Sequence, residues 1–254
     1  MSLLSYKIIG SGKPIVLLHG FMENQKMWNF IYENNTEYKW ILIDLPGHGN
    51  SDNYFILHSM EFMAEKVKQV LDYEKISDAF FISHSMGGYV TLAFLELFKE
   101  YFKGICMFFS SPLADTKDKK EQRLRAFEVA QENLDGFIKV GVPNLFNQNL
   151  LEDLEDEIKS AKDMAKETSL QGITAALLGM RERKDRTELL KLCKFPILFL
   201  CGTFDSAVPS SQIKQLYENV EHITYKELPI GHMGHLEAPE SCEKLIMNFI
   251  HKYY

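Results

Sequence analysis

The 254-residue sequence has no excess of basic residues: 28 lysines and arginines stand against 35 acidic residues, giving a formal charge of -7. Nucleic-acid binding needs a basic face that contacts phosphates, so this balance argues against a nucleic-acid partner. The one notable basic cluster, residues 117–125, is interleaved with acidic side chains. We expect it to form the solvated face of a helix rather than a binding patch.

Long hydrophobic runs and closely paired cysteines are also absent. No stretch reaches the eighteen or so apolar residues of a membrane span, and residues 1–10 lack the basic start and apolar run of a secretion signal. No two of the four cysteines form a C-x-x-C pair; they are Cys106, Cys193, Cys201 and Cys242. We expect buried free thiols in a cytoplasmic protein without a membrane span.

Low-complexity tracts and internal repeats are missing as well. With 46% hydrophobic and 25% charged residues, the composition is that of a compact globular protein rather than a disordered one. A chain of this length can form one domain around a single core.

Short apolar runs alternate along the chain with longer segments that have helical periodicity. This alternation predicts an α/β fold, with a mostly parallel sheet flanked by helices, and the continuous hydrophobicity of the runs predicts strands buried on both faces. The predicted strands are 15–19, 40–44, 79–83, 105–109, 196–201 and 222–227. Amphipathic helices are predicted at 61–73, 88–100 and 239–251.

The strand pattern stops at residue 113 and returns only after residue 192. Between these points the sequence predicts helices at 119–134, near Phe137, at 150–166 and at 170–183. This indicates a helical cap inserted into an α/β core. The predicted organisation is therefore 1–112 for the first part of the core, 113–192 for the cap and 193–254 for the second part of the core.

The strongest local signal for chemistry surrounds Ser85, between the strand at 79–83 and the helix that begins near Gly88. A serine on a tight turn from strand to helix exposes its hydroxyl above the sheet edge, and it needs small residues two positions away on each side. Ser83 and Gly87 stand at those positions. The segment resembles the Gly-x-Ser-x-Gly nucleophile elbow of the α/β-hydrolase superfamily, with Ser83 in place of the first glycine. The resemblance implies that Ser85 is the nucleophile.

Two segments before the elbow extend the resemblance. Residues 17–22, LLHGFM, resemble the family's His-Gly-x turn, which implies an oxyanion hole built from the backbone N–H groups of Phe21 and Met86. We expect His19 to brace this loop. Residues 44–51, DLPGHGNS, resemble a structural loop of the family. Asp44 precedes the nucleophile, whereas the family's order is serine, acid, histidine, so we expect Asp44 to hydrogen-bond the loop backbone.

Two segments after the cap supply the remaining matches. Residues 202–209, GTFDSAVP, resemble the family's Gly-x-x-Asp-x-x-Val-Pro segment, which implies that Asp205 is the acid that orients the base. A helix N-cap is the alternative role for this aspartate. Residues 229–240 resemble the family's Gly-His loop, which implies His232 as general base. His235, three residues later, is expected to face away from Ser85 or toward the cap.

Taken together, the resemblance implies an α/β-hydrolase fold and a serine hydrolase that cleaves carboxylic esters through an acyl-enzyme on Ser85. It implies no metal and no organic cofactor. Dehalogenases and epoxide hydrolases of this superfamily use an aspartate nucleophile, so Ser85 argues against both. Thioester, amide and carbon–carbon bond hydrolysis stay open, as does a small-molecule receptor with vestigial hydrolysis; the oligomeric state is also open.

Apolar residues of the predicted cap suggest a pocket for a small to medium apolar ester, although packing in the core explains them equally well. These residues are Phe137, Val140, Leu145, Phe146, Leu177 and Met180.

Overall fold

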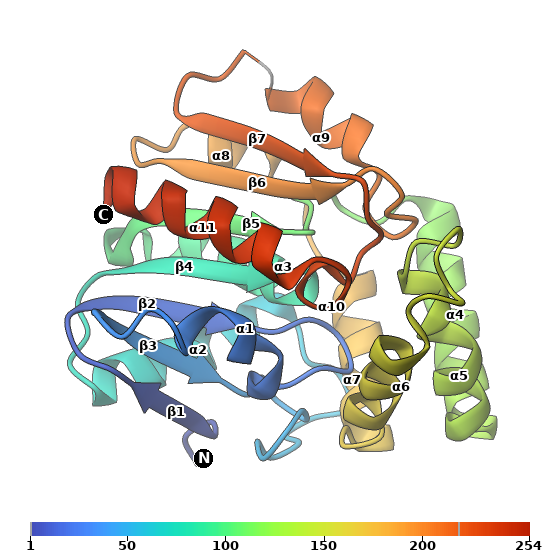
Figure 1. Ribbon diagram of the computed structural model, residues 1–254. Coiled ribbons are helices and arrows are strands. Elements are labelled where there is room, and N and C mark those ends of the chain that lie inside the picture. Colours follow the sequence, from blue (N-terminus) through green and yellow to red (C-terminus); the bar gives the residue numbers. More distant parts are fainter. Residues whose placement is uncertain (1, 218) are drawn as a thin grey trace.

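The structure is a computed structural model that describes residues 2–217 and 219–254. Its centre is a seven-stranded sheet in the order β1-β3-β2-β4-β5-β6-β7 (Figure 1), in which β1 is antiparallel to β3 and the other pairings are parallel. The strands are β1 (Tyr6–Ile9), β2 (Lys13–Leu18), β3 (Tyr38–Ile43), β4 (Ala79–His84), β5 (Phe102–Phe108), β6 (Ile197–Gly202) and β7 (Ile223–Leu228). The predicted α/β class is confirmed.

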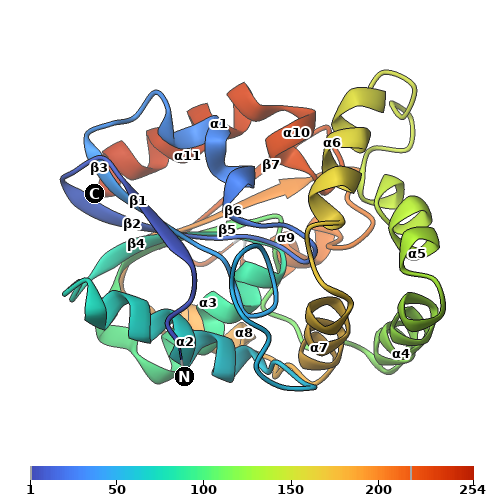
Figure 2. The same ribbon diagram turned by 90° about the horizontal axis from the view of Figure 1, so that it is seen from below.

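Helices cover both faces of the sheet. Successive side chains of a strand point to opposite sides, so strands made of continuous apolar residues have two apolar faces to bury. In β2, Val16 and Leu18 pack into one apolar cluster and Ile15 and Leu17 into the other. Figure 2 shows the sheet edge-on between the two helical layers. The first cluster includes residues of α2 (Met60–Tyr73), α3 (Met86–Leu97), α8 (Thr187–Lys191) and α9 (Ser210–Tyr217), and the second those of α11 (Pro239–Tyr253) and α1 (Asn29–Tyr32).

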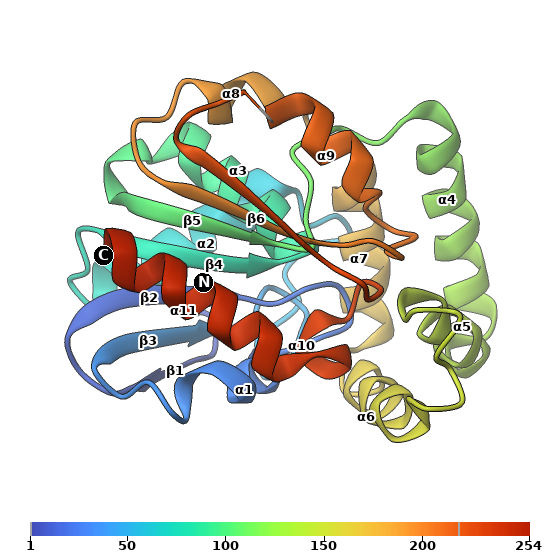
Figure 3. The ribbon, with the colours of Figure 1, turned by 45° about the horizontal axis from the view of Figure 1, so that its top comes forward.

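A helical segment, residues 113–192, connects β5 to β6. Its longer helices are α4 (Lys117–Glu132), α5 (Leu134–Gly141), α6 (Glu155–Ala165) and α7 (Leu170–Arg181). In the views of Figures 1 and 3 helices α4 to α7 lie beyond the carboxyl ends of the strands, where the arrowheads point, whereas α8 packs against the sheet. Ligand sites in parallel α/β folds form at this edge of the sheet, so the segment stands over the place where a site is expected.

Several short elements differ from the prediction. The strand β1 was not predicted because its four residues are only partly buried, and its sequence gives no apolar run. The single-turn helices α1, α8 and α10 (Gly234–Glu237) are too short to show helical periodicity. The same holds for the 3₁₀ turns at Gln25–Trp28, Lys99–Tyr101 and Pro143–Leu145. The helix expected at 150–166 begins at Glu155, after a turn.

Burial agrees with the prediction for the central strands and for three of the four cysteines, but not for Cys193. Every residue of β4 and β6 is buried, whereas the edge strand β7 is only partly so. The four cysteines are free thiols; Cys193 is partly exposed and the other three are buried. Within the described residues, no helix has the length and apolar character to cross a membrane.

Candidate active site

Ser85 lies on a strained turn between β4 and α3. Its φ of 47° and ψ of -112° place a non-glycine residue at positive φ, a conformation that costs energy and persists only where the surroundings enforce it. The backbone N–H of Ser85 donates to the Phe108 carbonyl at 3.1 Å, which ties the turn to β5. A Cβ at Gly87 would collide with the backbone carbonyls of Leu18 and His19. Only glycine fits there, as the elbow pattern requires.

Ser83 stands directly before this turn, at the end of β4. It is fully buried, and its hydroxyl is hydrogen-bonded to the hydroxyl of Thr91 on α3. The residue that departs from the family pattern therefore links the end of β4 to the helix that follows the turn.

The structure brings Ser85, His232 and Asp205 together from three strand ends. The Ser85 hydroxyl donates to His232 Nε2 at 2.8 Å, and His232 Nδ1 donates to Asp205 Oδ2 at 2.7 Å. Asp205 follows β6, and its Oδ1 accepts the backbone N–H groups of Ala207 and Val208 at 2.8 and 2.9 Å. Both Asp205 and His232 are buried. One carboxylate thus orients the ring and is itself held by the turn that follows it.

The loop that carries His232 is fixed by Glu237, a residue to which sequence reasoning gave no role. Its carboxylate accepts the backbone N–H groups of Gly231 at 2.9 Å, Met233 at 3.1 Å and Asn147 at 3.0 Å. The N–H of His232 donates to the Leu145 carbonyl at 2.7 Å. The helical segment is therefore attached to His232 itself through Leu145, and to Glu237 through Asn147.

The two backbone groups predicted to form an oxyanion hole lie on the loop after β2 and at the start of α3. Met86 is the first residue of α3, where an N–H has no acceptor within the helix. For the N–H of Phe21, the described residues supply no hydrogen-bond acceptor. Phe21 and Ser85 line the same cavity. Both amides are thus free to donate to a ligand.

Two further predicted residues serve the loops rather than the reacting groups. His19 Nδ1 donates to the Gly20 carbonyl at 2.7 Å and its Nε2 accepts the Leu45 N–H at 2.8 Å, so its ring braces the loop as expected. Asp44 accepts the N–H groups of Gln25 at 2.8 Å and Asn50 at 3.0 Å. It makes loop contacts, as its position before Ser85 predicted.

This arrangement of strand ends agrees with the comparison to known families. The sequence model of the alpha/beta hydrolase fold matches residues 13–239. The chain belongs to the α/β-hydrolase family.

Several α/β-hydrolases and related proteins are similar over most of the chain. A pimeloyl-[acyl-carrier protein] methyl ester esterase of Wigglesworthia glossinidia brevipalpis is 28% identical over 262 residues, covering 98% of both chains. A dihydrolipoyllysine-residue acetyltransferase component of the acetoin cleaving system of Pseudomonas putida is 27% identical over 95% of this chain, which spans only 64% of that protein's length. A thermophilic esterase of Thermogutta terrifontis, solved with malate bound, is 28% identical, with a TM-score of 0.92 and coverage of 98% of this chain and 93% of that one.

A cavity of about 190 Å³ contains Ser85 and His232 and is closed partly by the helical segment. Of the six apolar residues singled out there, Leu145 and Met180 line it, whereas Val140 is 67% exposed. The prediction for the basic cluster was wrong in part. Lys119 and Arg123 of α4 line this cavity instead of facing solvent, because they lie one turn apart on the side of the helix that faces the core.

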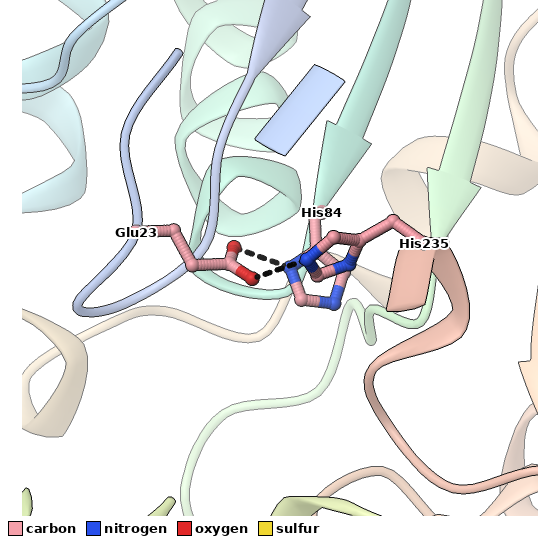
Figure 4. Close-up of side chains that lie close together, drawn as sticks. All are labelled: Glu23, His84 and His235. Carbon is pink, nitrogen blue, oxygen red and sulfur yellow. Dashed lines mark hydrogen bonds and ion pairs between the residues drawn. The ribbon is translucent and has the colours of Figure 1, made fainter. Parts of the chain in front are cut away.

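A second buried polar group of this α/β-hydrolase lies beside Ser85 and His232. Glu23, His84 and His235 come from the loop after β2, the end of β4 and the start of α10, and Figure 4 shows their side chains meeting. His84 Nδ1 donates to Glu23 Oε2 at 2.6 Å, and His235 Nε2 lies 3.5 Å from Glu23 Oε1. His84 Nε2 donates to the His232 carbonyl at 3.1 Å. His235 itself makes no hydrogen bond to Ser85.

Sequence reasoning missed this group, although the acidic residue in the loop after the first buried strand and the histidine directly before Ser85 were visible signals. Two histidines and a carboxylate are a common metal-binding set. Here, however, both nitrogens of His84 face acceptors, which requires the doubly protonated ring and leaves no lone pair for a metal. The contacts therefore fit a buried ion pair between Glu23 and the His84 imidazolium.

The pKa values of the group agree with an ion pair. Burial alone would lower the pKa of His84, but the charge of Glu23 and the hydrogen bond to it outweigh burial and raise it. Burial alone would raise the pKa of the Glu23 carboxyl, but the nearby His84 charge outweighs burial and holds that pKa below its usual range. Burial lowers the pKa of His235 to about 4, so this ring is neutral at pH 7.

We expect Glu23→Gln to destabilise the protein by about 2–4 kcal/mol near pH 6, because it leaves the buried His84 without its counter-ion. The carboxylate stabilises the fold above its unfolded pKa of about 4.3 and this contribution is lost as the pH falls. The histidine contributes below its unfolded pKa of about 6.5, and its share is lost as the pH rises through the raised folded value. The loss caused by the substitution should therefore shrink at alkaline pH, once the pH passes the raised folded pKa of His84 and the ring loses its proton.

Urea unfolding of both proteins between pH 5 and 9 measures this difference. Glu33→Gln makes the same chemical change at an exposed position and should alter stability by no more than about 0.5 kcal/mol. A destabilisation by Glu23→Gln that is equal at every pH would contradict the ion pair.

Proposed function

We propose that the protein is a serine hydrolase that cleaves carboxylic esters through an acyl-enzyme on Ser85. The observation that carries this proposal is the continuous chain of hydrogen bonds from the Ser85 hydroxyl through His232 to Asp205, at 2.8 and 2.7 Å. A serine hydroxyl is a weak nucleophile, and a hydrogen-bonded base oriented by a third group is what activates it.

In the proposed mechanism, Ser85 Oγ attacks the ester carbonyl while His232 Nε2 accepts the serine proton. Asp205 holds the Nδ1–H, which fixes the tautomer whose Nε2 is free, and stabilises the imidazolium that forms. The backbone N–H groups of Phe21 and Met86 hold the oxyanion, each contributing about a hundred- to a thousandfold in rate. The imidazolium then protonates the departing alcohol, and the same histidine activates the water that hydrolyses the acyl-enzyme.

The helical segment acts in this proposal as a cap that sets substrate size. The cavity at Ser85, at about 190 Å³, is smaller than the several hundred Å³ of a pocket for a drug-sized ligand. It therefore favours a short acyl chain. The names of similar proteins support ester cleavage: one is called a methyl ester esterase and another a thermophilic esterase.

The test is steady-state hydrolysis of p-nitrophenyl esters of graded acyl length. We expect many turnovers per active site, with kcat/KM highest for acyl chains of about two to six carbons, in keeping with the small cavity. Saturable binding of ligand with a single burst of product and almost no further turnover would instead indicate a receptor of the same fold. Turnover of thioesters or amides much faster than that of esters would redirect the proposal to those bonds.

A further inference from the structure

Two cationic side chains share the cavity with the nucleophile. Lys119 and Arg123 lie four residues apart on α4 and line the same cavity as Ser85 and His232. The other ionised residues that line it, Glu23 and His84, form the ion pair described above and balance each other. The net charge of the cavity therefore depends on which anionic groups neutralise Lys119 and Arg123.

Arg123 is only partly neutralised. Its Nε donates to Asp115 Oδ2 at 2.6 Å, but Asp115 Oδ1 lies 2.6 Å from a terminal nitrogen of Arg183. One carboxylate thus serves two guanidinium groups. Arg183 also stacks on Tyr89, with 4.1 Å from its central carbon to the ring centroid. Both arginines are held rigidly, and together with Asp115 they leave one positive charge beside the cavity.

Lys119 has no counter-ion among the residues that the structure describes: none of their carboxylates forms an ion pair with its ammonium group. Burial lowers the pKa of this lysine and the nearby Arg123 charge lowers it further, and the charges of Asp115 and Asp205 do not outweigh these effects. Lysines normally extend to reach solvent. Lys119 instead lines both the cavity at Ser85 and a neighbouring one of about 210 Å³, which also share Tyr89 and Ala207.

We propose that the substrate carries a carboxylate, bound by Lys119 and Arg123, in addition to the ester that Ser85 attacks. This inference rests on the proposed ester hydrolysis and adds the class of substrate: a short ester with one free carboxylate, such as the half-ester of a dicarboxylic acid. The carboxylate supplies the counter-ion that Lys119 lacks and accepts charge-assisted hydrogen bonds, which are stronger than neutral ones. A neutral ester of the same size leaves the partly buried ammonium without a counter-ion.

The experiment compares monomethyl glutarate with its neutral dimethyl ester, by pH-stat titration at low salt. The quantity measured is the ratio of kcat/KM for the anionic ester to that for the neutral one. Lys119→Met, which removes the charge and keeps the length, should lower this ratio about tenfold to a hundredfold. Lys119→Arg should restore most of it. Acetyl-lactate and its methyl ester repeat the comparison with the carboxylate on the alcohol side.

Lys117→Met is the matched control, because it removes the same charge from an exposed position of α4. It should leave the ratio within about twofold. A second measurement needs no variant: in the wild type, raising the salt from 0.05 to 0.5 M should lower kcat/KM for the anionic ester more than for the neutral one.

The outcomes separate the two proposals. A ratio that Lys119→Met leaves unchanged on both the acyl and the alcohol side, or lowers no more than Lys117→Met does, overturns the carboxylate site while ester hydrolysis stands. Hydrolysis of none of the four esters, together with none of the p-nitrophenyl esters, overturns the proposed function itself.

Discussion

Replacing Ser85 with alanine should lower kcat for ester hydrolysis by roughly a millionfold, the scale seen when a triad nucleophile is removed. The hydroxyl is the group that would form the acyl-enzyme, and its hydrogen bond is to His232. No other hydroxyl is bonded to that nitrogen within the described residues. Loss of Ser85 Oγ therefore removes covalent catalysis and leaves only the contribution of the oxyanion donors.

Folding should survive this change. Alanine and serine meet the same backbone strain at a φ of 47°, so the substitution neither adds nor removes that cost. The lost methyl-sized hydroxyl takes no part in the apolar clusters. Urea midpoints of the wild type and the variant should agree closely, which separates loss of chemistry from loss of structure.

A fluorophosphonate probe supplies the second measurement, because it labels only a serine activated by a base. We expect one labelled site in the wild type and none in Ser85→Ala. Ser206→Ala is the control: this exposed serine adjoins Asp205 but donates to the Asn144 carbonyl, so labelling should persist. Labelling that remains after Ser85→Ala would assign the nucleophile elsewhere.

The sheet and the residues at its strand ends could be predicted from the sequence, because each depends on local patterns. Buried parallel strands have continuous apolar runs, and their carboxyl ends meet at one edge of the sheet. Residues that follow separate runs, such as Ser85 and Asp205, can therefore be placed near each other without knowing the fold in detail. The short strand β1 had no such run, and its pairing with β3 depends on tertiary contacts.

The contacts of the charged groups around the site could not be predicted from the sequence in the same way. Glu23 and His84 are 61 positions apart, and their ion pair arises only because the loop after β2 crosses the end of β4. Lys119 was predicted to face solvent, because helix faces with alternating charges are usually solvated, but it lines the cavity. Which face of α4 looks inward is decided by its packing against α7 and by the core below, and charge order alone does not reveal it.

The Glu23–His84 ion pair and Glu237 together fix the loop that carries His232. The Glu23–His84 pair holds the backbone of His232, and Glu237 holds the residues on each side of it. The position of the histidine is thus set by two carboxylates, neither of which is hydrogen-bonded to Ser85. Preorganisation of this kind matters, because a displacement of about 1 Å in a reacting group can cost about a hundredfold in rate.

The two histidines of the loop after β7 should differ strongly in their effect on turnover. His232 accepts the Ser85 hydroxyl and donates to Asp205, so His232→Ala or His232→Gln removes the base and should lower kcat by about 10⁴- to 10⁶-fold. His235 contacts neither of these residues; its nearest charged group is Glu23, at 3.5 Å. His235→Gln should lower kcat at most roughly tenfold, through small shifts of the loop.

The His235 variant should lose stability even though it remains active. His235 is 5% exposed and packs against Phe30 and His84, with ring centroids 6.4 and 5.5 Å apart, so its loss disturbs a buried cluster. We expect His235→Gln to cost about 1–3 kcal/mol. Both variants should be assayed with one ester at one pH, alongside urea unfolding. If His235→Gln were inactive while His232→Gln turned over normally, the base would lie three residues further along the loop and the hydrogen bond between Ser85 and His232 would not be the one used in catalysis.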